Sequence, residues 1–168
     1  MTTTETTAFA IHALPSEALE FVRAKGVDAS GIPVERIVAD GGEPLRCCLR
    51  DARPKERLLL FGYQPPLPAS PYREAGAVFA HVQPCTGPAE ANEYPRDWRG
   101  RAQVLRAYDK RGWIHPTTRM HNGDDPDRVI AEILADADVV QIHSRNVAYG
   151  CYMFTITRAD ALSSAEAV

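Results

Sequence analysis

The chain has 168 residues, of which 45% are hydrophobic and 24% charged, and this composition is typical of a globular domain with its own core. The net charge of −3 argues against a broad basic surface for nucleic acid. No apolar run approaches the roughly 20 residues that a membrane-spanning helix needs. The N-terminal MTTTETT lacks the charged and then apolar pattern of a signal sequence. We therefore expect a soluble cytoplasmic protein that binds neither nucleic acid nor membranes.

The first half of the chain predicts strands, one helix and a proline-rich loop. The helix is expected over 15–26, where apolar residues form one stripe and Gly26 supplies a stop. The loop is expected over 64–76, because its prolines cannot donate to a sheet ladder, and it would cross the surface or line the rim of a cleft. The expected strands cover residues 8–14, 34–40, 46–49, 57–63 and 77–83.

The second half predicts further strands and the clearest helix. Strands are expected at 102–109 and 112–120, and a closing hairpin at 139–158. The helix at 124–138 has an aspartate cap and Pro126 at an early position. Strands joined by short turns pair antiparallel, so the predicted fold class is α+β, with one mostly antiparallel sheet and about two main helices. We expect a single globular domain over 8–160, with flexible termini at 1–7 and 161–168.

Four stretches in the same order resemble a known family. They are RCCLRDARPKERLLLFGY, SPYREAGAVFAH, VLRAYD and VVQIHSRNVAYGCY, and together they resemble the bacterial domain-of-unknown-function family 1203 from about residue 34 to residue 158. The resemblance implies a small single-domain protein and supplies no activity. The family pattern has a cysteine directly before the arginine of RCCL, where this chain has Leu45. A mechanism that needs a thiol at that position is therefore not expected here.

The closing hairpin carries the most concentrated polar chemistry. Side chains alternate between the two faces of a strand, and opposed residues of an antiparallel pair share a face. A three-residue loop ending at Gly150 would bring His143, Arg145 and Cys151 to one face. Its opposed pairs would be His143–Thr155, Arg145–Met153 and Val147–Cys151. A two-residue loop would instead place Cys151 with Ser144 and Asn146. We expect the three-residue loop.

These residue types favour an enzyme that acts on a small polar anion without a cofactor. Cys151 is the expected nucleophile or acid–base partner, and His143 or His81 would move protons. Guanidinium groups suit a carboxylate or phosphate. The expected substrate-binding residues are Arg145, Arg106, Asn146, Arg46, Tyr72, Arg73 and Glu74.

Each of these residues also has a purely structural interpretation. The polar hairpin face could simply meet solvent, Cys151 could be a small core residue, and Arg106 could pair with Glu74 or Asp51. A non-catalytic module that binds a small anion or a peptide is therefore the alternative function. A structural or assembly protein, which could dimerise through an exposed strand, is the third. The sequence leaves the oligomeric state open.

The sequence predicts no metal site. The four cysteines (Cys47, Cys48, Cys85 and Cys151) are expected to be free thiols. HVQPC places His81 four residues before Cys85, but the paired-ligand spacing of zinc sites is missing. His115 and His121 lie near acids that are better explained as the cap and first turn of the following helix.

Overall fold

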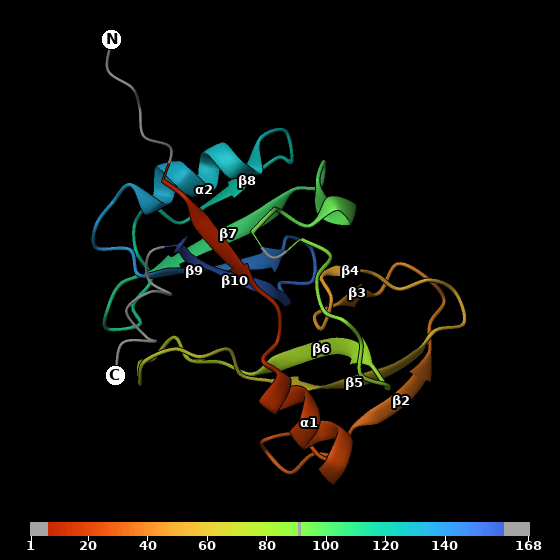
Figure 1. The fold of residues 1–168 in the computed structure, drawn as a ribbon. Coiled ribbons are helices and arrows are strands. Elements are labelled where there is room, and N and C mark those ends of the chain that lie inside the picture. The colour runs from red at the N-terminus through yellow and green to blue at the C-terminus, as the bar shows by residue number, and fades with distance from the viewer. Residues whose placement is uncertain (1–6, 91, 160–168) are drawn as a thin grey trace.

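Two five-stranded sheets form the protein in a computed structural model, which describes residues 7–90 and 92–159 (Figure 1). The first, which we call the terminal sheet, has the order β1 (Phe9–His12), β10 (Tyr152–Arg158), β9 (Gln141–Asn146), β7 (Gln103–Tyr108) and β8 (Arg119–His121). The second, the middle sheet, has the order β2 (Glu35–Val38), β5 (Arg57–Tyr63), β6 (Gly76–His81), β3 (Pro44–Leu45) and β4 (Arg50–Asp51). The helices are α1 (Ser16–Lys25), α2 (Pro126–Leu134) and the short 3-10 helix η1 (Arg96–Trp98).

The α+β fold class is confirmed, but the expected single sheet is wrong. Every strand pair is antiparallel except β3–β6, which runs parallel with Leu45 opposite Phe79. Hydrophobic alternation predicts a strand and its buried face, but it does not say which strand lies beside it. The division of the strands between two sheets is therefore not predictable from the hydrophobic pattern.

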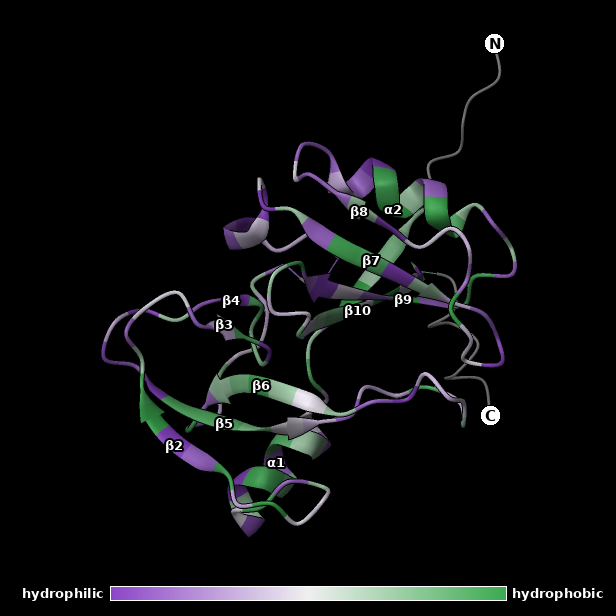
Figure 2. Ribbon diagram, turned by 180° about the vertical axis from the view of Figure 1, so that it is seen from behind, coloured by the Kyte–Doolittle hydropathy of each residue, from purple (hydrophilic) through white to green (hydrophobic). Residues whose placement is uncertain are grey.

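The start of α2 and the end of α1 follow the predicted signals, but α2 ends at Leu134, four residues before the predicted end at 138. The Asp125 carboxylate accepts the Arg128 backbone N–H, and Pro126 opens α2. Gly26 ends α1 in the left-handed region with φ 66°. The helix α1 packs against the middle sheet, and α2 packs against the terminal sheet. Figure 2 shows many hydrophobic residues, in green, along α1 and β5.

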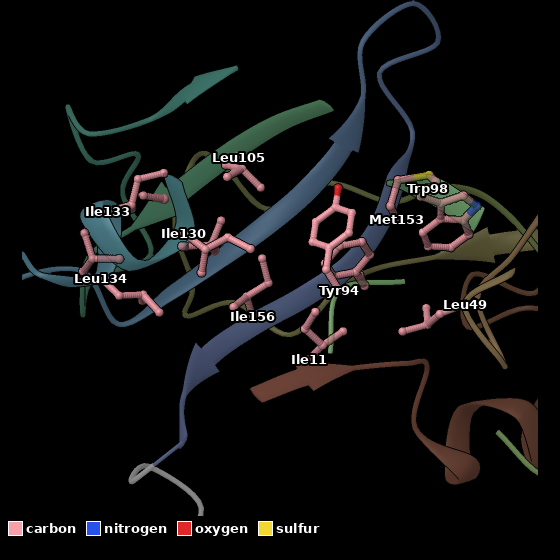
Figure 3. Packing of buried hydrophobic residues seen from close by; sticks show 14 residues of the cluster. Ile11, Leu49, Tyr94, Trp98, Leu105, Ile130, Ile133, Leu134, Met153 and Ile156 are labelled. Carbon is pink, nitrogen blue, oxygen red and sulfur yellow. The ribbon is translucent and has the colours of Figure 1, made fainter. Parts of the chain in front are cut away.

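Each sheet has its own core, and one turn of the chain reaches into both. In the core of the terminal sheet, Trp98 stacks on Phe154 with ring centroids 5.9 Å apart. Leu49 enters this core from the turn between β3 and β4, and Figure 3 shows its side chain in the same cluster as Trp98 and Met153. Cys47, two residues earlier, packs in the core of the middle sheet. The turn at 46–49 therefore lies where the two sheets meet.

Two expected strands are not strands. Residues 46–49 form that turn instead, and residues 112–118 form an irregular segment before β8, with an isolated bridge from Ile114 to Tyr108. The flexible termini expected at 1–7 and 161–168 lie outside the described residues, apart from Thr7. Within residues 7–90 and 92–159, no helix has the length and apolar character to cross a membrane.

Candidate functional site

The turn at 46–49 is a single helical turn closed by a left-handed leucine. The Leu49 backbone N–H donates to the Leu45 carbonyl at 2.9 Å, and Leu49 has φ 55°. A non-glycine residue in this region carries strain of about 1–3 kcal/mol. Burial of the Leu49 side chain, which is 5% exposed, offsets that strain. The turn holds Cys47 and Cys48 side by side, with their sulfur atoms 3.9 Å apart.

His81, the last residue of β6, faces this turn. The parallel contact between β3 and β6 fixes the approach, since the Arg46 N–H donates to the Phe79 carbonyl at 2.8 Å. The His81 backbone N–H donates to Cys47 Sγ at 3.3 Å. The His81 Nδ1 atom lies 3.5 Å from Cys47 Sγ and 3.9 Å from Cys48 Sγ. One ring nitrogen of His81 therefore points at both thiols.

The other ring nitrogen of His81 is held by a carboxylate. The Nε2 atom lies 3.1 Å from Glu56 Oε1 and 3.2 Å from Arg50 Nη2, and Arg50 has the Glu56 carboxylate itself as its acceptor. Arg50 donates to both Glu56 oxygens, and this ion pair lowers the pKa of Glu56 to about 2. An ionised carboxylate only accepts hydrogen bonds, so it favours the tautomer with the proton on Nε2. That tautomer leaves the Nδ1 lone pair directed at the sulfur atoms.

Cys85 completes a four-residue group that we call the Cys/His cluster: Cys47, Cys48, His81 and Cys85. One ligand atom from each residue lies within 4.8 Å of all the others. A tetrahedral zinc ion with three sulfur ligands and one nitrogen ligand would separate its ligand atoms by about 3.5–3.8 Å, from the usual bond lengths. The measured separations of 3.5, 3.9 and 3.9 Å among Cys47, Cys48 and His81 are close to those values.

The thiols of the cluster differ in their electrostatic environment. The pKa of Cys47 lies well below its usual value, because the Cys48 thiol and the His81 backbone N–H donate to its sulfur. The pKa of Cys48 is raised by the Cys47 sulfur beside it and by burial. Burial also raises the pKa of Cys85. The surroundings therefore favour the thiolate form of Cys47 more than that of Cys48 or Cys85.

Two cavities border the cluster. The larger has a volume of about 770 Å³, and its lining includes Cys48, His81 and Cys85. The smaller has a volume of about 540 Å³, and its lining includes Arg36, Arg57 and again His81 and Cys85. Volumes of 300–1,000 Å³ are usual for small-molecule sites. The cluster is therefore accessible from open space on two sides.

The structure corrects the predicted hairpin register. His143 lies opposite Thr155 as predicted, but Arg145 lies opposite Tyr152 instead of Met153. The Asn146 N–H donates to the Cys151 carbonyl at 2.9 Å, so Cys151 does not face Val147. A bulge in β10 between Tyr152 and Phe154 takes up one residue, and four residues, 147–150, form the loop.

This register separates the two predicted catalytic residues of the hairpin. Because side chains alternate, Cys151 lies on the Asn146 face of the hairpin and His143 on the opposite face. His143 is 2% exposed and lies between the rings of Tyr108 and Tyr152. Burial lowers the pKa of His143 to about 3, and the nearby arginines act in the same direction. The catalytic role of this pair stays a prediction, which its placement disfavours.

The predicted anion-binding arginines of the terminal sheet do share a partner. Arg106 donates to Glu74 Oε1 at 3.0 Å, and Arg145 donates to the same oxygen. The space lined by Tyr72, Arg73, Glu74, His143 and Arg145 is only about 10 Å³. Glu74 therefore fills this position in the structure, and the substrate-binding role of its neighbours stays a prediction.

The remaining candidates are dispersed. Arg46 is 1% exposed, and its guanidinium donates to the carbonyls of Tyr152 (2.8 Å) and Pro44 (2.5 Å). Asn146 caps the hairpin loop through the Tyr149 N–H. His115 comes together with Asp136 and Asp138, whereas His121 contacts Tyr94 in the core.

Sequence reasoning assigned His81 to the site but missed Cys47, Cys48 and Cys85. The four-residue spacing in HVQPC and the adjacent pair of cysteines were the only signals. Neither signal alone has zinc-site spacing. The structure supplies the missing information, because β3 and β6 bring the two segments together.

Comparison with known proteins gives a family but no function. No curated protein and no solved structure matches the chain. The family described as "Protein of unknown function (DUF1203)" matches residues 42–158, a range that contains all four residues of the Cys/His cluster. The chain belongs to this family.

Proposed function

We propose that this protein binds one zinc ion through the Cys/His cluster. The observation that carries the proposal is that three sulfur atoms and one ring nitrogen of His81 all lie within 4.8 Å of one another. The separations among Cys47, Cys48 and His81 are close to those of a tetrahedral site. Sulfur and imidazole ligands in tetrahedral geometry suit zinc better than magnesium or calcium, which prefer oxygen. This proposal replaces the expectation, drawn from the sequence, that there is no metal site.

The surroundings of the cluster support a metal ion over a Cys–His catalytic pair. A catalytic pair needs one thiol, whereas three thiols gather here, and one zinc ion can take three cysteine ligands together with a histidine. Glu56 orients His81 in the way that a carboxylate commonly orients a zinc-bound histidine. The ion would join the β3–β4 turn to the end of β6, so it would stabilise the junction of the two sheets.

Metal titration of the reduced protein tests the proposal. Cobalt is added first, because its absorption reports thiolate ligands and tetrahedral geometry, and zinc then displaces it. We expect one ion per chain and a loss of affinity of more than about 100-fold in Cys47→Ser and His81→Asn. Cys151→Ser removes the one cysteine outside the cluster and serves as the control. Absence of binding, or equal effects of Cys47→Ser and Cys151→Ser, would refute the zinc site.

The ligand-orienting role of Glu56 has its own test. Glu56→Gln should weaken zinc binding by about 10–100-fold, since outer carboxylates usually contribute that much. Glu43→Gln is the matched control, because Glu43 accepts the backbone N–H groups of Asp40 and Gly41 and does not contact His81. Equal affinities in the two variants would exclude the orienting role.

A second candidate function is the binding of a small anion on the terminal sheet, as an enzyme site or a binding module. The observation in its favour is that Arg106 and Arg145 already hold a carboxylate, that of Glu74. Glu74→Gln would weaken this internal partner and should raise the affinity for inorganic phosphate. If phosphate binding is unchanged both in Glu74→Gln and in Arg145→Gln, the two arginines and Glu74 form an ordinary ion pair and the anion-binding function is refuted.

A further inference from the structure

We infer that Cys85 is an exchangeable ligand of the proposed zinc ion, and that a small polar thiol takes its place from the larger cavity. This inference rests on the zinc site proposed above. It concerns a difference among the four ligands, three of which are held firmly and one of which is not.

Three ligands are fixed by the fold. Cys47 is 3% exposed and lies in a turn closed by the Leu49 N–H, and its sulfur also accepts the His81 N–H. Cys48 is the next residue of the same turn. His81 ends β6 and is held on its far side by Glu56. Movement of any of these ligands would disrupt a strand end or the turn.

Cys85 is held much less firmly. Its side chain is exposed, and it lies in the segment that leads from β6 toward η1. Among the described residues 83–90 of this segment, no backbone group makes a backbone–backbone hydrogen bond. The Arg23 guanidinium donates to the Gln83 carbonyl at the start of the segment. The backbone N–H that reaches the Cys85 sulfur comes from Gly87 in the same segment, so it does not tie Cys85 to either sheet. Segments with few hydrogen bonds and exposed side chains open at low free-energy cost. Cys85 can therefore leave the ion without unfolding either sheet.

The cavities are placed to receive an incoming ligand. Cys85 lines both the 770 Å³ and the 540 Å³ cavity, whereas Cys47 lines neither. Departure of Cys85 would leave three protein ligands and one open position, the arrangement that catalytic zinc sites have. A site with four fixed protein ligands offers no such position.

The chemistry of the position selects the class of ligand. The remaining ligands would be two thiolates and one imidazole, a soft set that favours another sulfur ligand. The lining of the larger cavity includes charged side chains of both signs, among them Arg53, Arg96 and Glu93. Such a lining suits a polar molecule. In the exchange, the incoming thiol binds zinc through sulfur and its proton passes to the departing Cys85 thiolate, so atoms and charge balance.

Alkylation of the zinc-loaded protein tests the exchange directly. Iodoacetamide is applied to the apo and zinc-loaded forms, and peptide mapping gives a protection factor for each cysteine. Zinc should protect Cys47 and Cys48 at least about tenfold more than Cys85, and the zinc should remain bound while Cys85 reacts. Equal protection of Cys47 and Cys85, or release of zinc in step with alkylation of Cys85, would overturn the inference.

A pair of cobalt-loaded variants tests the ligand class. Cys85→Ser and Cys47→Ser each remove one of three thiolates, so each should lose about a third of the thiolate-to-cobalt absorption. Added 2-mercaptoethanesulfonate should restore it in Cys85→Ser only, because the Cys47 position is sealed, and 2-hydroxyethanesulfonate should restore neither. Restoration in both variants or in neither would overturn the inference. A wild-type protein that binds no metal overturns the zinc site as well, whereas wild-type binding without restoration overturns the exchange alone.

Discussion

Replacement of His143 by glutamine should make the protein less sensitive to mild acid. His143 is buried between two tyrosine rings, and its pKa in the folded protein is about 3, against 6.5 ordinarily. Below pH 6.5 the unfolded chain takes up a proton that the folded chain excludes. Stability therefore falls as the pH decreases from 6.5 toward 3 and is unaffected by this group above 6.5.

The magnitude follows from the difference between the two pKa values. Between pH 6.5 and pH 3, each decrease of one pH unit lowers the free energy of unfolding by about 1.4 kcal/mol for one proton. Between pH 7 and pH 5, His143 should therefore remove about 2 kcal/mol from the free energy of unfolding. His143→Gln also loses ring packing against Tyr108 and Tyr152, but that loss does not depend on pH.

Urea unfolding at pH 7, 6 and 5 measures the effect. The stability difference between wild type and His143→Gln should shrink by about 2 kcal/mol from pH 7 to pH 5. Thr155→Val is the control, because Thr155 lies opposite His143 and does not titrate. Parallel pH profiles for wild type and His143→Gln would show that the burial argument is wrong.

Three further predictions concern packing, hydrogen bonding and metal. Gly62→Ala should destabilise by about 1–3 kcal/mol, since the new Cβ would lie 2.5 Å from one oxygen of the Asp28 carboxylate, and three backbone N–H groups hold that carboxylate in place. Gly76→Ala, with open space around it, should change stability by less than about 0.5 kcal/mol. Arg46→Met should lower stability by roughly 2 kcal/mol or more, because the buried carbonyl of Tyr152 and the partly buried carbonyl of Pro44 lose their donor, and a loss under about 0.5 kcal/mol would contradict this. A chelator should lower stability by about 3 kcal/mol relative to protein with zinc at 100 times its Kd, and identical urea midpoints would contradict it.

Local signals were enough to predict the helices and the closing hairpin. Asp125 and Pro126 mark the start of α2, Gly26 marks the end of α1, and alternation marks β9 and β10. These features depend on residues close together in the chain. The bulge in β10 does not, because nothing in the sequence fixes where the extra residue is taken up.

The Cys/His cluster could not be predicted in the same way. Cys47 and His81 are 34 positions apart and meet only because two residues of β3 run parallel to β6. The sequence RCCL predicts a strand at the turn, because three of its four residues are apolar and its left-handed residue is a leucine instead of a glycine. Strand pairing between distant segments is the information that a single sequence carries least clearly.

The contacts of the two chain ends bear on when this protein can fold during its synthesis. Strand β1 pairs within its sheet only with β10, and the Arg46 guanidinium donates to a carbonyl 106 positions later in the chain. A nascent chain emerging from the ribosome therefore has to wait for its final strand before its first strand and the β3–β4 turn find these partners. The Cys/His cluster itself does not depend on β10, because its four residues lie between positions 47 and 85, in the segment that builds the middle sheet.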